Sequence, residues 1–234
     1  RVPDVQSHGH PPRLVISANA QRGSTVSDPT ELCFLSAVEA LALIRARKLS
    51  PVELVDAAIA RAEALQPKLN AFVTTLFDQA RERARALEAE LARGGPVRPL
   101  HGLPVTLKDL LFTKGIPTKA GSWIFADRVP EVDAPVVEQL RAAGAVFLGK
   151  TTVPEMGWKG CGDSPLTGIS HNPWKHGYNA GGSSTGAAIC AAAGIGLLHQ
   201  GSDGAGSIRM PAAFCGVFGL KPSFGRIPYW PVPN

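Results

Sequence analysis

The sequence predicts an α/β fold in which a mixed central β-sheet is sandwiched between helices. Short β-rich runs alternate with helical patterns along most of the chain, which is typical of sheets whose strands are joined by covering helices. Helix caps and glycines mark the joins between these runs. Hydrophobic residues make up 44% of the 234 positions, enough to bury a substantial core.

The two ends of the chain differ from its middle. Residues 1–27 hold proline, histidine and serine without an apolar period, so we predict an N-terminal extension outside the core, with a docking arm as the alternative. Residues 28–234 are predicted to form one domain. The final segment, "GRIPYWPVPN", brings no helix to cover the last predicted strand, so we expect the natural protein to continue and complete the sheet.

Capping boxes mark the first two helices. In "SAVE", Ser36 is the N-cap and Glu39 reaches back to it. In "SPVE", Ser50 and Glu53 take the same positions, and Pro51 occupies the favoured first helical position. These signals predict amphipathic helices over residues 37–47 and 51–66.

The alternation of strands and helices begins at "AFVTT", residues 71–75. A helix is predicted to open at Asp78 and to close at Gly94 and Gly95. The elements predicted after it are a buried strand over 103–109, a helix capped by Asp133 and ended by Gly144, a strand over 145–149, an Ala-rich helix over 186–193, a strand over 195–200, a short helix after Ser207 and a strand over 217–221.

Composition and charge exclude several classes of protein. The formal net charge of +5 comes from scattered Lys and Arg without a long run of like charges, so we predict no direct nucleic-acid partner. The longest apolar run, residues 187–198, is shorter than the roughly 20 residues of a membrane-spanning helix, and no signal-peptide pattern opens the chain. The cysteines show no metal-ligand spacing, which favours a reducing, cytoplasmic location with neither metal nor other cofactor; they are Cys33, Cys161, Cys190 and Cys215.

Two strings match the patterns of well-known motifs, but the residues around them do not fit those motifs. "GAVFLGKT" fits the P-loop pattern, but its intervening residues form a predicted strand and Gly144 ends the preceding helix, so Lys150 is interpreted as a strand-end lysine. "GSSTG" fits a nucleophile elbow around Ser184. That elbow needs a strand directly before it and a catalytic histidine downstream; "HNPWKHGYNA" predicts no strand, and His199 lies in an apolar strand as a core residue.

A third set of residues carries more chemistry. Lys108 ends the apolar run "LPVTLKD", and lowering the pKa of a buried lysine from about 10.4 to near 7 takes roughly 4.6 kcal/mol and makes it a general base. "GGSS" places Ser183 and Ser184 together. "DGAGS" supplies flexible backbone whose amides can turn toward one point, and a helix that begins near Ser207 adds its positive end. This pattern favours an oxyanion hole beside a serine nucleophile.

The strings "GLPVTLKD", "GGSSTGAA" and "GSDGAGSIRMPAAFCGVFGLKPSFGR" resemble the amidase signature family, and the resemblance runs from Glu31 to Asn234. It implies hydrolysis of a small-molecule carboxamide through an acyl-enzyme. In this resemblance Ser207 is the nucleophile, Ser183 the bridging serine after a cis peptide bond with Gly182, and Lys108 the base. It also implies further roles: the backbone amides of Gly204, Ala205, Gly206 and Ser207 hold the oxyanion, Asp203 and Arg209 support the loop, and Ser184 orients it.

The chain departs from the family pattern in three small ways and one larger one. Ala180 stands where the family usually has proline before "GGSS", Thr185 replaces the glycine after it, and Ala205 replaces a frequent glycine, which puts the backbone angles of that loop in question. Family members also usually continue for two hundred or more residues, so the resemblance implies an incomplete pocket.

The function stays open among three hypotheses at this stage. An amidase is favoured over the A subunit of a glutamine-dependent tRNA amidotransferase and over a non-catalytic relative or fragment. Met156 and Trp158 are predicted either to face the acyl chain of the substrate or to belong to the core. Neither the acyl group nor the oligomeric state follows from the sequence, and a homodimer is one option for the latter.

Overall fold

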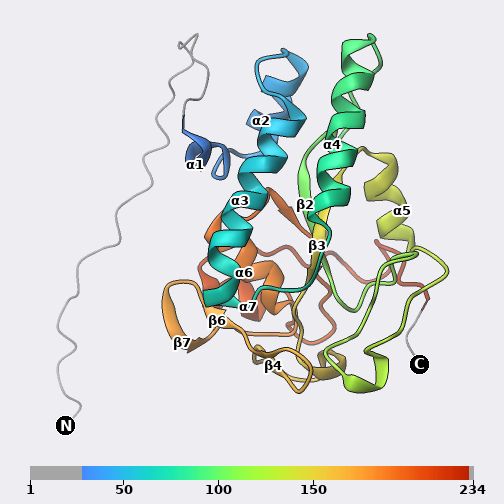
Figure 1. The fold of residues 1–234 in the computed structure, drawn as a ribbon. Coiled ribbons are helices and arrows are strands. Elements are labelled where there is room, and N and C mark those ends of the chain that lie inside the picture. Colours follow the sequence, from blue (N-terminus) through green and yellow to red (C-terminus); the bar gives the residue numbers. More distant parts are fainter. Residues whose placement is uncertain (1–27, 232–234) are drawn as a thin grey trace.

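The computed structural model describes residues 28–231, and the predicted extension over residues 1–27 lies outside them (Figure 1). The central sheet has the order β1-β3-β2-β8. β1 runs antiparallel to β3, whereas β2 runs parallel to both β3 and β8. The predicted mixed sheet is therefore confirmed, and its strands are β1 (Phe72–Thr75), β2 (Pro104–Lys108), β3 (Val146–Thr151) and β8 (Leu198–His199).

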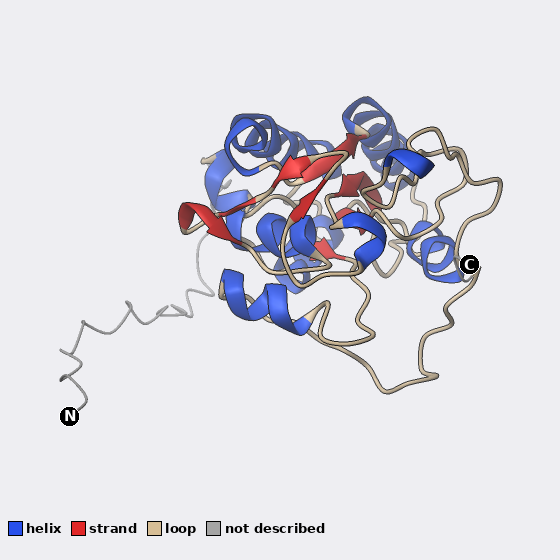
Figure 2. Ribbon diagram, turned by 90° about the horizontal axis from the view of Figure 1, so that it is seen from below, coloured by secondary structure: helices blue, strands red, loops and turns tan. Residues whose placement is uncertain are grey.

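Helices lie on both sides of these strands (Figure 2). α3 and α4 pack against each other, and α4 and α6 pack against the sheet. The α-helices are α1 (Pro29–Leu32), α2 (Ala37–Arg45), α3 (Pro51–Leu69), α4 (Phe77–Ala92), α5 (Pro135–Ala142), α6 (Thr185–Ala193) and α7 (Arg209–Cys215). Two short 3₁₀ helices lie at Trp123–Phe125 and Glu155–Gly157. No helix within residues 28–231 is both long and apolar enough to cross a membrane.

Side-chain caps mark the starts of α2 and α3 as predicted, but two other predicted starts differ. Ser36 and Glu39 form the predicted capping box, and Ser50 accepts hydrogen bonds from the first amides of α3. The start predicted at Asp78 is wrong, because α4 already begins at Phe77. The cap predicted at Asp133 is also wrong: its carboxylate accepts a hydrogen bond from the amide of Lys114 at 2.7 Å and pairs with Arg141, so it is not free for the helix amides.

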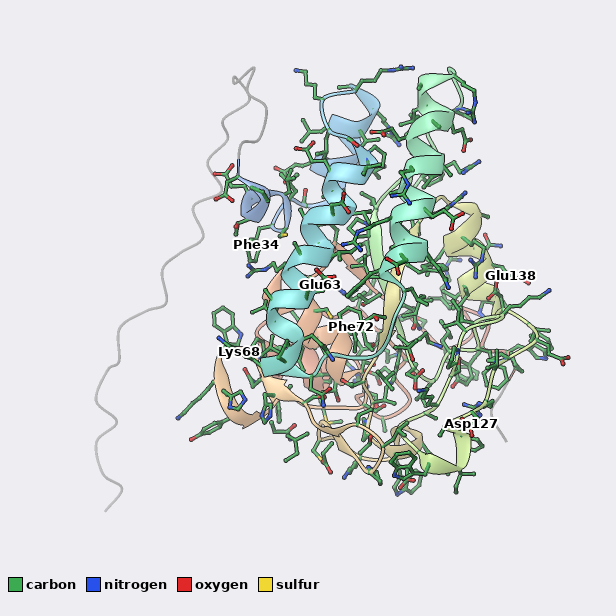
Figure 3. The ribbon with its side chains drawn as sticks, viewed as in Figure 1. Phe34, Glu63, Lys68, Phe72, Asp127 and Glu138 are labelled. Carbon is green, nitrogen blue, oxygen red and sulfur yellow. The ribbon has the colours of Figure 1, made fainter. Side chains whose placement is uncertain are left out.

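Alternate residues of β3 serve the two faces of the sheet. Val146 and Leu148 belong to the cluster formed with α3, α4 and α6. Phe147 packs instead with Val105, Leu107 and residues of α5. The outer sides of the helices are polar; Glu63 and Lys68 lie on the outer side of α3, whereas Phe72 lies inside (Figure 3).

Some elements differ from the prediction. Residues 217–221 form no strand; β8, the edge strand beside β2, is only two residues long and offers little backbone for pairing. In the segment without predicted strands, two short hairpins form because each pairs locally. They are β4 (Asp163–Ser164) with β5 (Gly168–Ile169), and β6 (His171–Asn172) with β7 (Lys175–Asn179), so the prediction that "HNPWKHGYNA" holds no strand is wrong.

Helix α6 approaches the sheet unusually closely at Gly186. A Cβ atom there would lie 2.1 Å from the carbonyl oxygen of Ala71 and 2.7 Å from the amide nitrogen of Thr152. The amide of Gly186 also donates to the carbonyl oxygen of Thr152 at 3.0 Å. These contacts are to backbone atoms, which cannot rotate away, so this position requires glycine.

We expect Gly186→Ala to lower the free energy of unfolding by about 3 kcal/mol, because overpacking at this point must displace backbone. For a domain of this size the melting temperature should fall by roughly 6–12 °C. Thermal unfolding followed by circular dichroism measures this. Ala191→Gly in the same helix is the control and should cost only about 1 kcal/mol; a melting temperature of Gly186→Ala equal to that of the control would contradict the close approach.

Candidate active site

Lys108 is the last residue of β2 and points away from α5. Val105 and Leu107 pack on the α5 side, and side chains alternate along a strand, so Thr106 and Lys108 project to the opposite face. The side chain of Lys108 is 1% exposed. A lysine that a central strand delivers to the interior must find polar partners there.

The Lys108 amine lies among oxygen atoms of two serines. Its Nζ atom is 2.8 Å from Ser183 Oγ, 3.0 Å from Ser202 Oγ and 3.1 Å from the carbonyl oxygen of Ser202. Burial lowers the pKa of Lys108 to about 7, and the carboxylate of Asp203 opposes that shift. The amine therefore exists in comparable neutral and charged fractions near neutral pH.

Ser202 was not predicted to take part in the site. It belongs to the same motif, "GSDGAGS", as Asp203 and Ser207. The motif indicated flexible backbone, but nothing in its spacing indicated that this particular hydroxyl and carbonyl would reach a lysine from β2. Its place just after the strand predicted over residues 195–200 was the signal available in the sequence, and the pairing of that strand with β2 appears only in the structure.

Ser183 lies in a turn that glycines make possible. The peptide bond between Gly182 and Ser183 is cis, as the resemblance implies. Gly181 has φ +76°, and a Cβ atom on it would lie 2.6 Å from the Cα atom of Pro211. Thr185, which replaces the usual glycine, closes the turn by donating from its hydroxyl to the carbonyl oxygen of Gly181 at 2.8 Å. The turn thus accommodates this departure from the family pattern.

Ser207 is held against that turn through the backbone. The amide of Ser184 donates to the carbonyl oxygen of Ser207 at 3.0 Å. The hydroxyl of Ser184 donates to the carbonyl oxygen of Ser202 at 3.2 Å and lies 3.3 Å from the amide nitrogen of Ser202. Both ends of the 202–207 loop are therefore bound to the turn that carries Ser183, which brings the three residues of the predicted triad into one region.

The carboxylate of Asp203 organises the loop around Ser207. Its side chain is fully buried and accepts two hydrogen bonds from the guanidinium of Arg209, at 2.9 and 3.0 Å. It also accepts hydrogen bonds from the backbone amides of Gly206, Ile208 and Arg209, at 2.6, 3.1 and 3.2 Å. Arg209 first, and then these amides, hold the pKa of Asp203 far below its usual range. The structure thus places Asp203 and Arg209 together, with Ser207 between the bonded amides.

The amides predicted to hold the oxyanion are not all equivalent. The amides of Gly206 and Ile208 donate to the carboxylate of Asp203, whereas the amide of Ser207, which lies between them in the chain, does not. Ala205 keeps a negative φ angle, so the alanine in place of glycine brings no left-handed strain. The role of Gly204, Ala205, Gly206 and Ser207 as oxyanion donors stays a prediction.

A broad cleft of about 1390 Å³ opens beside the loop. Ser184, Ser202 and Asp203 line it on the polar side, while Leu111 and Leu198 are among its apolar lining residues. Such a mixture of a few polar groups with apolar walls is typical of sites for small organic molecules.

Met156 and Trp158 are not among the residues that line this cleft. Met156 is half exposed and Trp158 is 92% exposed. Gly157 between them is close to the site, because a Cβ atom on it would lie 3.2 Å from Ser183 Oγ. Neither side chain is part of the core, so that alternative is wrong, and the predicted contact of the two side chains with an acyl chain stays a prediction.

The structure also explains the two imitation motifs. Val146–Thr151 is β3 throughout, so the P-loop string forms no phosphate-binding loop and Lys150 is a buried residue of the sheet. His199 Nδ1 lies 2.9 Å from Thr106 Oγ1, and burial lowers the pKa of His199 to about 4. A histidine bound within the sheet in this way does not act as the base of a nucleophile elbow.

Comparison with known proteins places this site in a family. A model described as amidase matches residues 53–234. An acylamidase from Rhodococcus erythropolis is 48% identical over 197 residues, which are 84% of this chain and 41% of that protein. The A subunit of the glutamyl-tRNA(Gln) amidotransferase from Anaeromyxobacter dehalogenans is 46% identical over 197 residues, covering 84% of this chain and 40% of that protein.

The solved structures agree with these sequences. A bacterial aryl acylamidase of the amidase signature enzymes superposes with a TM-score of 0.81 at 37% identity, covering 86% of this chain and 42% of that one. The chain spans about two fifths of the length of the curated relatives that it matches. Because the amidase model matches well over half of the chain, including the segments that carry Lys108, Ser183 and Ser207, the chain belongs to the amidase signature family.

Proposed function

We propose that the protein hydrolyses a carboxamide to a carboxylate and ammonia or an amine through an acyl-enzyme on Ser207. The observation that carries this proposal is the buried Lys108 amine, 2.8 Å from Ser183 Oγ in the turn that also binds the backbone of Ser207. A serine hydroxyl is activated by a neighbouring base that accepts its proton, and the buried lysine of lowered pKa supplies such a base.

The oxygen atoms around Lys108 can also satisfy a neutral amine. A neutral amine has two N–H donors and one lone pair. The carbonyl oxygen and the hydroxyl oxygen of Ser202 can accept the two donors at 3.1 and 3.0 Å. In that neutral form the lone pair is left to face Ser183 Oγ at 2.8 Å and can accept the O–H of Ser183, whereas the charged amine donates to the same oxygen. Ser202 is therefore a residue that directs the lone pair of Lys108 toward Ser183.

The proposed reaction moves one proton in each half. Lys108 accepts the proton of Ser183 while Ser183 accepts that of Ser207, and Ser207 Oγ bonds to the amide carbon. Backbone amides of residues 204–207 stabilise the oxyanion. The proton returns through Ser183 to the departing nitrogen, the C–N bond breaks, and water then hydrolyses the ester on Ser207 by the same path.

We expect the rate of Ser207 acylation to rise with pH and to level off above about pH 7, because only neutral Lys108 accepts a proton and burial lowers its pKa to about 7. The acylation rate constant of a slow ester, measured from pH 5 to 9, gives the profile. Ser202→Ala removes one acceptor of the amine and should lower the plateau. A flat profile over this range would contradict the assignment of Lys108 as the base.

The second candidate function is that of a glutamine-dependent amidotransferase component. The 46% identity to the Anaeromyxobacter dehalogenans protein favours it. Such a component should release ammonia from glutamine, and the release should increase when a partner protein is present. A simple amidase should instead hydrolyse small aliphatic or aromatic amides without a partner.

The test is ammonia release by the full-length protein across aliphatic amides, aromatic amides and glutamine. We expect turnover of small amides, abolished by Ser207→Ala. Turnover of glutamine alone, dependent on a partner, would favour the amidotransferase. A protein that neither turns over amides nor reacts at Ser207 with a fluorophosphonate would be a non-catalytic relative. A cytoplasmic amidase without a cofactor, with a homodimer as one option for its assembly, is the version of this proposal that the sequence favours.

A further inference from the structure

A buried ion pair lies behind the site and is not used in the proposed reaction. Lys150 on β3 and Asp109, directly after β2, both have fully buried side chains. Lys150 Nζ lies 3.7 Å from Asp109 Oδ1. Charges at such depth are costly unless they are paired and hydrogen-bonded, so the groups that bind them show which segments the pair fixes.

A bulge in β3 places Lys150 on this side of the sheet. The pairing of β2 with β3 shifts between Val105 and Thr106, so that Leu107 pairs with Lys150 and Lys108 with Thr151. Paired residues point to the same face, and the shift thereby turns Lys150 toward the α5 side. Asp109 points to that side too, while its neighbour Lys108 points to the opposite face, toward Ser183.

The pair ties down the loop that leaves β2. Lys150 Nζ donates to the carbonyl oxygen of Leu111 and to Thr118 Oγ1, both at 2.7 Å. Asp109 Oδ2 accepts the amide of Lys119 at 3.0 Å, and the carbonyl oxygen of Asp109 accepts the amide of Ala120 at 3.1 Å. Residues 109–120 therefore fold back on the two charges.

The same loop forms part of the cleft. Leu110, Leu111 and Phe112 follow Asp109 and line it. Leu110 also approaches Gly157, since a Cβ atom on that glycine would lie 2.7 Å from Leu110 Cδ1 and 3.2 Å from Ser183 Oγ. A shift at Asp109 would reach Lys108 through one peptide bond and the wall of the cleft through the next residues.

Each charge of the pair depends on the other. Burial raises the pKa of Asp109 to about 6 and lowers that of Lys150 to about 8, and each partner opposes the shift of the other. Apart from this ion pair, Asp109 Oδ1 makes no hydrogen bond within the described part of the chain. Loss of either partner would leave a buried polar group without compensation.

We propose that Asp109 and Lys150 are positioning residues. They fix the direction in which the side chain of Lys108 projects from β2, and they hold in place the loop that forms the neighbouring wall of the cleft. This inference rests on the proposed role of Lys108. Neither residue touches Ser183, Ser202 or Ser207, so both act through the backbone that carries Lys108.

Asp109→Asn tests the inference because it keeps the shape of the side chain and removes its charge. The readout is the pH titration of the Lys108 ε-carbon signal in the full-length protein labelled with ¹³C-lysine, assigned by its absence in Lys108→Met. Asp109→Asn also removes a negative charge near the amine, so the double variant Asp109→Asn/Lys150→Met, in which the net charge of the pair stays at zero, is measured beside it. A midpoint displaced in both variants reports a moved amine and not the lost charge of Asp109. Val146→Ala, a cavity in β3 remote from the pair, is the control for lowered stability.

We expect the Lys108 midpoint to move by at least half a pH unit in Asp109→Asn, and the rate of Ser207 labelling by a fluorophosphonate, per folded molecule, to fall about tenfold or more. Val146→Ala should keep both values while its melting temperature falls. If Asp109→Asn does not fold, the double variant Asp109→Asn/Lys150→Met, which removes both charges of the pair, decides alone with the same expectation.

An unchanged Lys108 midpoint and labelling rate in a folded variant would overturn the inference and leave the pair a purely structural one. The failure of the proposed function looks different. In that case Ser207 of the parent protein is not labelled at all, and the titration of Lys108 alone decides whether the pair positions it.

Discussion

Ser207→Ala should abolish formation of an acyl-enzyme and lower amide hydrolysis by at least about 10³-fold, as removal of a serine nucleophile does elsewhere. Ser207 is the residue whose neighbouring amides Asp203 arranges, and its backbone is bonded to the turn that carries Ser183. A fluorophosphonate or a slow ester followed by intact-mass measurement detects the adduct directly.

Ser184→Ala is the informative comparison for this experiment. It removes the hydroxyl that contacts Ser202 but leaves the proposed nucleophile in place, so the adduct should still form, more slowly. A covalent adduct of the same mass on the Ser207→Ala protein would show that another side chain is the nucleophile.

Replacing Lys108 by methionine should remove activity and yet stabilise the fold. The charged amine loses hydration on burial, which lowers its pKa from 10.5 to about 7. Between these two values the unfolded chain binds one proton more than the folded chain, so this cost of folding is complete below about pH 7 and disappears as the pH rises to about 10.5.

The shift corresponds to about 5 kcal/mol at pH 7. Methionine leaves the hydroxyls of Ser183 and Ser202 without this partner, which offsets about half of the gain. We therefore expect Lys108→Met to raise the free energy of unfolding by about 2 kcal/mol at pH 7, and to bring no gain near pH 10.5. Urea unfolding at both pH values measures it, and a destabilised variant at pH 7 would show that the amine is not a buried, destabilising charge.

The same variant should distinguish amides from esters. An amine leaving group must be protonated as it departs, whereas an alkoxide leaves more readily, so loss of the group that returns the proton should cost about 10²–10⁴-fold more for the amide. Matched amide and ester substrates give the comparison. Equal losses on the two would remove Lys108 from the path of the proton.

Local sequence patterns were enough to predict a helix cap and three strands of the central sheet. The box of Ser36 and Glu39 forms as expected, and the β-rich runs at 71–75, 103–109 and 145–149 all contain strands of the central sheet. The strand expected at 217–221 depended on a pairing partner elsewhere in the chain, which no local pattern can supply. The hairpins β4 with β5 and β6 with β7 were missed because their strands are short and mostly polar.

The same distinction holds for the residues of the site, some of which lie in recognisable motifs while others depend on contacts between distant segments. Lys108, Ser183 and Ser207 could be named from the sequence because each lies in a string that resembles a motif of the family, and the three strings come in the same order. Ser202 escaped notice since its part depends on the three-dimensional pairing of β8 with β2. Lys150 and Asp109 face each other only because of the bulge in β3, and a one-residue shift in register leaves no mark in the composition of either strand.

The distances along the chain between the residues around Lys108 have a consequence for how the protein acquires its structure. Ser183 and Ser202 lie 75 and 94 positions from Lys108, and contacts over such separations require closure of long loops, which slows folding compared with helix formation. In a chain refolding from denaturant, helical circular dichroism should thus return before the reactivity of Ser207. That reactivity would then report completion of the native fold, so labelling of the proposed nucleophile would detect partly folded chains that a measurement of helix content alone would count as native.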